Sequence, residues 1–188
     1  HYVIASDQYT TNFQGIDFVL LIVVSVPLLF FQTGLEEIVF RGYLYQGFAI
    51  LTKYRFVAAV FSSLFFAAMH MGNPETYQYD TTQLFGYYFL TAIFLSILTI
   101  MEDNLYLAWA FHYANNFVAA VFFNYKGSAL NTYSLFKAEE LDMNSMLLSS
   151  FISFSILILA IAIWRRWKNW GRLTRKIHFE PLSQGLDF

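Results

Sequence analysis

Six polar residues stand out because they lie in segments that are otherwise almost entirely apolar. They are Glu36, Glu37, Arg41, His70, His112 and Asn116. A charged side chain at the centre of a bilayer costs at least about 2.5 kcal/mol even on insertion scales, so ionisable residues in such segments are rare and indicate function. Carboxylates and histidines can act as base and acid in hydrolysis, and His and Asn can donate hydrogen bonds to an oxyanion. The residue types therefore favour peptide hydrolysis by an activated water.

The spacing of these residues divides them into groups. Glu37 and Arg41 are four residues apart, which on a helix favours an ion pair, so Arg41 is interpreted as a supporting residue. His112 and Asn116 are also four residues apart and share one helix face, with Asn115 as the competitor for the role of Asn116. A base, an acid and oxyanion donors are thus all available.

Simpler interpretations exist for each residue taken alone. A single His or a single Glu–Arg pair within a membrane can serve only to pack helices. Four further acids, which we interpret as solvated loop acids or helix caps, are Glu75, Asp80, Glu102 and Asp103. Phe66 is interpreted as a packing residue.

The composition predicts a membrane protein. Of the 188 residues, 57% are hydrophobic, 21% aromatic and only 13% charged, which leaves too little polar surface to cover a water-soluble globule. The absence of cysteine excludes disulfides, thiolate metal sites and a cysteine nucleophile.

The positions of the apolar segments predict an all-α, polytopic transmembrane bundle of about six helices. A spanning helix needs about 20 mostly apolar residues. Five segments meet this requirement, namely 16–33, 55–71, 83–101, 104–123 and 146–164. A sixth helix is expected over 35–52, separated from the preceding helix by Gly34. The expected organisation is a short polar arm (1–15), a single membrane domain (16–164) and a basic tail (165–188).

The basic residues predict how the bundle is oriented. Six of the eleven Lys and Arg residues lie between Arg165 and Lys176, directly after an apolar segment, which favours lipid headgroups over nucleic acid as their partner. Placing this tail in the cytoplasm puts the loop 72–82 outside. Glu36 and His70 are then expected toward the extracytoplasmic side.

Three motifs carry a resemblance to a known family. They read Glu36-Glu37-Ile38-Val39-Phe40-Arg41, Phe66-Ala67-Ala68-Met69-His70 and His112-Tyr113-Ala114-Asn115-Asn116. Together they resemble the EExxxR, FxxxH and HxxxN pattern of the CPBP family of intramembrane glutamic proteases, the CAAX-protease and bacteriocin-processing proteins, also called Abi. Members commonly have additional helices before the first motif. Because this chain begins at His1 rather than Met, we expect it to be a fragment.

The resemblance implies a role for each residue. Glu36 would activate the attacking water, His70 would complete the water-holding pair, and His112 and Asn116 would stabilise the oxyanion. Glu37 and Arg41 would support the site. No cofactor or metal is expected, although Glu36, His70 and His112 could together bind zinc.

The expected substrates are membrane-associated peptides: prenylated CAAX-type tails, leader peptides or membrane proteins. The expected location is a prokaryotic cell membrane, in a multi-pass protein. Two alternatives stay open, a non-catalytic immunity or scaffold protein of the same fold and a zinc-dependent membrane protease. A proton-coupled transporter is a weaker third, because the sequence contains no inverted repeat.

Overall fold

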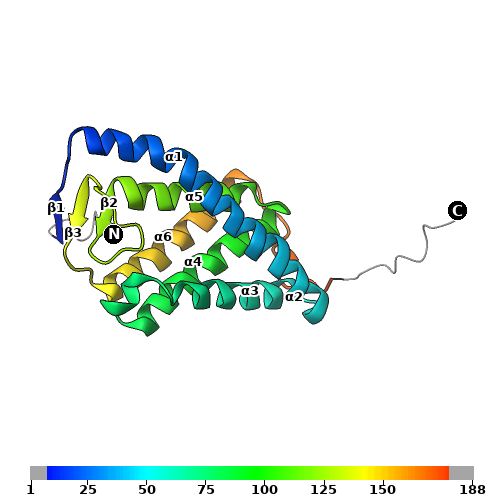
Figure 1. Ribbon diagram of the computed structural model, residues 1–188. Coiled ribbons are helices and arrows are strands. Elements are labelled where there is room, and N and C mark those ends of the chain that lie inside the picture. Colours follow the sequence, from blue (N-terminus) through cyan, green and yellow to red (C-terminus); the bar gives the residue numbers. More distant parts are fainter. Residues whose placement is uncertain (1–7, 178–188) are drawn as a thin grey trace, which may run out of the picture.

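The computed structural model describes residues 8–177 and shows a helical bundle (Figure 1). Its principal helices are α1 (Ile16–Glu37), α2 (Tyr45–Thr52), α3 (Arg55–His70), α4 (Thr81–Glu102), α5 (Tyr106–Val121) and α6 (Met143–Trp164). A π-helical segment, Ile38–Leu44, joins α1 to α2, and short 3₁₀ turns lie at Pro74–Tyr77 and Trp170–Arg172. The predicted all-α membrane bundle is confirmed.

The predicted break at Gly34 is wrong, because α1, the π-helical segment and α2 form one uninterrupted helix from Ile16 to Thr52 (Figure 1). At 37 residues it is about 55 Å long. Gly34 serves a different purpose, since the indole of Trp109 on α5 lies directly against it and donates a hydrogen bond to the Phe30 carbonyl (3.1 Å). A small residue here lets α1 and α5 approach closely.

Adding a methyl group at Gly34 should destabilise the bundle. A Cβ there would lie 2.6 Å from Cζ2 of Trp109, so one helix must move. We expect Gly34→Ala to lower the free energy of unfolding by about 1–3 kcal/mol, as other overpacking substitutions do. The measurement is denaturant unfolding in detergent micelles. Gly47→Ala is the matched control, because a Cβ there meets nothing within 4 Å, and it should be neutral or stabilising. Equal effects of the two substitutions would contradict the packing role of Gly34.

Three helices, rather than the five predicted segments, are long and apolar enough to cross a membrane by themselves among the described residues: Ile16–Thr52, α4 and α6. The two shorter helices, α3 and α5, have 16 residues each, or about 24 Å, against a hydrocarbon core of about 30 Å. Hydropathy alone overestimated their lengths, because the apolar residues continue into the turns that end them.

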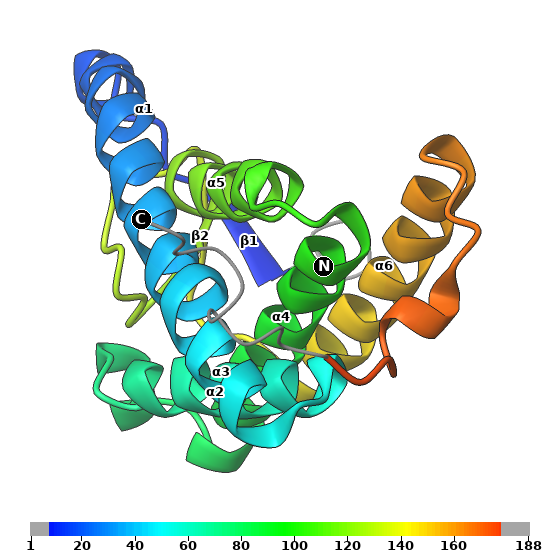
Figure 2. The same cartoon turned by 90° about the vertical axis from the view of Figure 1, so that its right-hand side faces the viewer.

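The centre of the bundle is α4, which contacts α3, α5 and α6 (Figure 2). Over half of its apolar window is buried (56%), against 22% for each of the other two spanning helices. Its buried side chains Phe94, Leu95 and Leu98 pack with Ala108 and Phe154. The other helices are therefore positioned around α4.

A small sheet, which the sequence did not predict, lies at one end of the bundle (Figure 1). Its strands are β1 (Tyr9–Thr11), β2 (Phe123–Tyr125) and β3 (Phe136–Ala138) in the order β1-β3-β2, with β3 antiparallel to β1 and parallel to β2. Strands of three residues are too short to show an alternating pattern. Part of the predicted polar arm is therefore attached to the loop after α5.

Charged residues gather at the opposite end of the bundle. Arg165 pairs with Glu102 (2.7 Å), and Asp103 is 3.0 Å from Arg172 and 3.6 Å from Arg55. Interpreting Glu102 as a solvated acid was therefore wrong. Two of the six basic tail residues bind protein carboxylates, and the tail returns to the same end as Arg55, as the orientation argument requires. Residues 1–7 and 178–188 of the two predicted terminal segments lie outside the described residues.

Candidate active site

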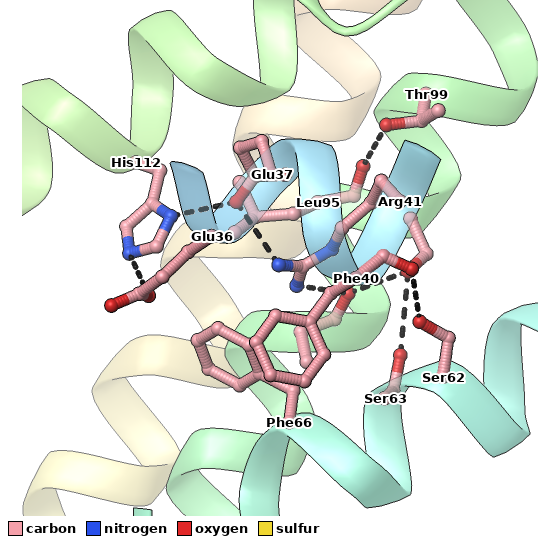
Figure 3. A network of polar contacts seen from close by, with 12 residues as sticks. Glu36, Glu37, Phe40, Arg41, Ser62, Ser63, Phe66, Leu95, Thr99 and His112 are labelled. Atoms are coloured by element: carbon pink, nitrogen blue, oxygen red, sulfur yellow. Dashed lines mark hydrogen bonds and ion pairs between the residues drawn. The ribbon is translucent and has the colours of Figure 1, made fainter. Parts of the chain in front are cut away.

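The six predicted site residues come from four elements, and Figure 3 shows four of these residues, Glu36, Glu37, Arg41 and His112. The two glutamates end α1 and Arg41 lies in the π-helical segment that follows. His70 is the last residue of α3, and His112 and Asn116 lie on α5. Because α1 continues into α2, the glutamates lie in the middle of a long helix rather than at the start of one. The roles of these residues stay predictions, and the geometry below shows what each can do.

Glu37 is the most tightly held of the six. It is 1% exposed, and its Oε1 accepts hydrogen bonds from Arg41 Nη1 (3.0 Å) and His112 Nδ1 (2.6 Å). The second guanidinium nitrogen of Arg41 donates to the Ala92 carbonyl (3.1 Å) on α4, and its Cζ lies 4.6 Å from the ring centre of Phe66. Both charges are removed from water and compensate each other. Both bonds go to Oε1 of Glu37, while its buried Oε2 makes no hydrogen bond among the described residues and Glu37 does not line the cavity described below.

The π-helical segment gives the site a local geometry that the sequence did not reveal. Such segments are rare, and they are frequently found at functional sites. Here the wider turn carries Arg41 toward α4, while the Phe40 carbonyl accepts a hydrogen bond from Ser62 on α3. The ring of Phe40 packs edge-on against Phe66 at 5.0 Å between centroids. The segment is therefore attached to both neighbouring helices.

Glu36 lies next to this ion pair but faces a cavity of about 250 Å³. Its side chain is 23% exposed. Its Oε1 accepts a hydrogen bond from Gln32, while Oε2 has no hydrogen-bond partner among the described residues and lies 3.6 Å from His112 Nε2. Oε2 of Glu37 is also without a partner among the described residues, but of the two glutamates only Glu36 lines the cavity, so Glu36 is the one placed to meet a water molecule there.

The bonds of His112 determine what its second nitrogen can do. Because Nδ1 faces the Glu37 carboxylate, which only accepts, Nδ1 carries a proton. Nε2 is then an acceptor in the neutral ring and a donor only in the imidazolium. Asn116 Nδ2 lies 3.4 Å from this nitrogen. His112 can therefore stabilise an oxyanion when it is protonated, with Asn116 as a neutral donor beside it.

His70 lines the same cavity as Glu36. Its Nδ1 lies 2.7 Å from the Phe66 carbonyl, so Nδ1 donates and Nε2 of the neutral ring is left as an acceptor. The ring lies between Phe66 and Tyr88, each 4.3 Å away between centroids. His70 is thus held in one orientation with its basic nitrogen free. Phe66 does pack, as predicted, and it also positions this histidine.

The positions of Asn115 and Asn116 differ less than the sequence suggested. Both Asn115 and Asn116 line the cavity, but within residues 8–177 only Asn116 forms a hydrogen-bonding contact with His112. Among residues 8–177, no three His, Asp or Glu side chains are placed to hold a metal ion together. The geometry therefore does not support the three-ligand zinc set of Glu36, His70 and His112.

Glu75 is the cavity residue that the sequence interpretation missed. It was interpreted as a solvated loop acid or cap, but it is 2% exposed and lines the same cavity as Glu36 and His70. Tyr88, Tyr125 and the backbone of Ala129 enclose it. Two of these lie about 50 residues later in the chain, so no local pattern could have revealed its burial.

The family described as type II CAAX prenyl endopeptidase Rce1-like matches residues 17–118, more than half of the chain, and this range contains all three motifs. The uncharacterized protein YyaK of Bacillus subtilis (strain 168) is 29% identical over 172 residues, covering 89% of this chain and 56% of the relative. The chain thus spans little more than half the length of that protein. No solved structure matches this chain. The predicted relationship to CAAX proteases is confirmed, and the chain belongs to the Rce1-like family.

Proposed function

We propose that this chain forms the catalytic part of an intramembrane endopeptidase of the glutamic type. The observation that carries the proposal is that Glu36 and His70, from two different helices, line one cavity. Oε2 of Glu36 makes no hydrogen bond among the described residues, and Nδ1 of His70 is engaged by the Phe66 carbonyl, which leaves its Nε2 for a water molecule. A water molecule between them would have a base on one side and a second proton acceptor on the other. This is what hydrolysis without a covalent intermediate requires.

The reaction follows from these positions. Glu36 takes a proton from the water as the oxygen attacks the peptide carbonyl carbon and the C–O bond forms. The resulting oxyanion accepts hydrogen bonds from Asn116 Nδ2 and from the imidazolium Nε2 of His112. The C–N bond then breaks, and the amine leaves with the proton from Glu36, relayed by His70. Glu37 and Arg41 keep His112 oriented throughout.

An apolar groove beside the catalytic cavity favours a substrate that is partly embedded in the membrane. An apolar groove of about 440 Å³ lies between α5 and α6 and shares five lining residues with the catalytic cavity. They are Tyr87, Asn115, Ala119, Tyr125 and Met146. The groove can hold an apolar segment or a lipid chain while the adjoining peptide bond reaches Glu36. We therefore propose membrane-associated peptides as substrates.

The placement of charges narrows these substrates further. The cavity lies toward the sheet, since residues 128–130 line it, whereas the basic residues gather at the other end. If the basic end faces the cytoplasm, the site opens toward the extracytoplasmic half of the membrane. Leader peptides and membrane proteins then fit better than cytoplasmic prenylated tails. We propose a multi-pass location in a bacterial cell membrane, to which the Bacillus relative lends support.

The metal-free mechanism is tested by cleavage in the presence of chelators. Purified protein in lipid vesicles should release two fragments from membrane-anchored peptides, as measured by mass spectrometry. Addition of EDTA or phenanthroline should change the rate by less than about twofold, because Glu36 itself supplies the base. Inhibition that added zinc reverses would instead support the zinc-dependent alternative. A known zinc membrane protease assayed in parallel shows that the chelators act in vesicles.

A further inference from the structure

Glu75 is a buried carboxylate for which the proposed hydrolysis has no use. It lies in the 3₁₀ turn Pro74–Tyr77, five residues after His70, and its Oε1 accepts three hydrogen bonds. The donors are the hydroxyls of Tyr88 and Tyr125 (3.3 Å each) and the backbone N–H of Ala129 (3.0 Å). All three donors bind the same oxygen of the carboxylate.

The other oxygen of Glu75 has no partner. Oε2 is buried and makes no hydrogen bond among the described residues, yet the side chain lines the catalytic cavity. A buried charged atom without a hydrogen bond is costly, so a native structure is expected to supply a partner from elsewhere. The protein thus binds Oε1 of Glu75 and leaves Oε2 able to accept a hydrogen bond from another molecule.

The charges around the cavity determine which partner fits. Its described lining includes two carboxylates, Glu36 and Glu75, two histidines, and no Lys or Arg. Arg41 does not compensate them, because it is bound to Glu37 and Ala92 and does not line the cavity. Even with His112 as the imidazolium that the proposed mechanism uses, the two carboxylates exceed this one positive charge, so the cavity is net negative. Its surroundings are of low polarity, where an anion attracts a cation most strongly.

We propose that Glu75 forms a specificity subsite that binds a Lys or Arg side chain of the substrate close to the bond cleaved. The inference rests on the proposed peptidase function and adds to it a preference for a basic residue. The ammonium or guanidinium group donates to Oε2, while Tyr88, Tyr125 and Ala129 hold Oε1. The ring of Tyr88 also lies 4.3 Å from that of His70 between centroids, so the subsite lies beside the proposed catalytic histidine. The substrate would then have an apolar part in the groove between α5 and α6 and a basic residue at Glu75.

The test measures binding rather than cleavage, so that its outcome is separate from that of the proposed function. The probes are fluorescent peptides with a leucine-rich membrane segment of about 20 residues and a short extension. Lys or norleucine occupies one position of the extension at a time. The two residues have the same aliphatic chain and differ by the charged amine. Affinities are measured for the Glu36→Gln protein in lipid vesicles, where no turnover should occur.

We expect at least one position at which Lys binds about tenfold or more tightly than norleucine, as a charge-assisted hydrogen bond would give. Adding Glu75→Gln should reduce that ratio to about one. The glutamine oxygen can still accept the bonds from Tyr88, Tyr125 and Ala129, so the loop has no reason to move. Glu140→Gln is the matched control, since it removes an exposed acid of the same end of the molecule that does not line the cavity, and the ratio should persist.

Two results would overturn the subsite. If the Lys and norleucine peptides bind equally at every position to the protein that retains Glu75, then Glu75 only connects the loops. A ratio that survives Glu75→Gln would place the cation elsewhere. Should Glu75→Gln fail to fold, a ratio near one at every position still overturns the subsite. A preference for Lys is then assigned with Glu75→Asp, which keeps the charge but withdraws the carboxylate, so the ratio should fall, and an unchanged ratio would place the cation elsewhere. Absence of cleavage by the unsubstituted protein would contradict the peptidase proposal alone.

Discussion

Glu36→Gln should abolish peptide hydrolysis while the protein stays folded. Glutamine has the shape of glutamate and can still accept the hydrogen bond from Gln32, but its amide cannot take a proton from water. General acid–base catalysis contributes about 10²- to 10⁴-fold, so we expect a fall in kcat of at least about a hundredfold. The measurement is the initial rate of fragment release from a membrane-anchored peptide, with unfolding recorded on the same samples.

Glu139→Gln is the control for this substitution. Glu139 is an exposed acid that pairs only weakly with Lys126 at the sheet end (3.3 Å), so its loss should leave the rate within about twofold of the unsubstituted protein. Full activity of Glu36→Gln would rule out Glu36 as the base. A protein that cleaves no peptide, yet retains its biological effect in the Glu36→Gln form, would instead be a non-catalytic immunity or scaffold protein.

Arg41→Met should have the largest effect on stability. Arg41 and Glu37 are both almost completely buried, and Met removes one charge while retaining much of the apolar volume. Breaking a buried ion pair from one side costs about 3–5 kcal/mol, because the remaining charge is left in the interior. We expect a loss of that size in the free energy of unfolding, measured by denaturant titration in micelles. Lys168→Met, which removes an exposed charge, should change it by less than about 0.5 kcal/mol.

A second substitution shows whether the loss of stability in Arg41→Met comes from the Glu37 carboxylate that it leaves unpaired. In the double variant Glu37→Gln with Arg41→Met, no charge is left behind, so it should be more stable than Arg41→Met alone. Its activity should nevertheless stay low. His112 loses the carboxylate that orients Nδ1, so its Nε2 is no longer held in position to donate to the oxyanion. If the double variant were as unstable as the sum of the single ones, the two residues would act independently, contrary to the structure.

Much of the candidate site could be predicted because its residues differ in type from their surroundings. Ionisable side chains in an apolar segment are conspicuous, and the four-residue spacings of Glu37 with Arg41 and of His112 with Asn116 require only that the segment is helical. The structure retains both pairs. The sequence could not show which of Glu36 and Glu37 is placed to act as the base, because this depends on which carboxylate faces Arg41 and which faces a cavity.

Gly34 and Glu75 show why other features could not be predicted. A glycine between apolar segments indicates a break when only the local sequence is considered, but Trp109, 75 residues later, makes it a packing position inside one helix. An acid after a Gly-Asn-Pro turn indicates a solvated loop, but Tyr125 and Ala129 bury it. In both cases the deciding contact comes from a distant part of the chain.

The sequence by itself predicted a helical membrane protein from its composition, and its three motifs carried the resemblance to CAAX proteases, since composition and motifs are both properties of short segments. Only the tertiary structure decided which of the polar residues bind one another and which face the cavity. Burial and hydrogen bonding depend on contacts between segments, and these contacts engage Glu37 with Arg41 and His112 while leaving Glu36, His70 and one oxygen of Glu75 open to a common cavity.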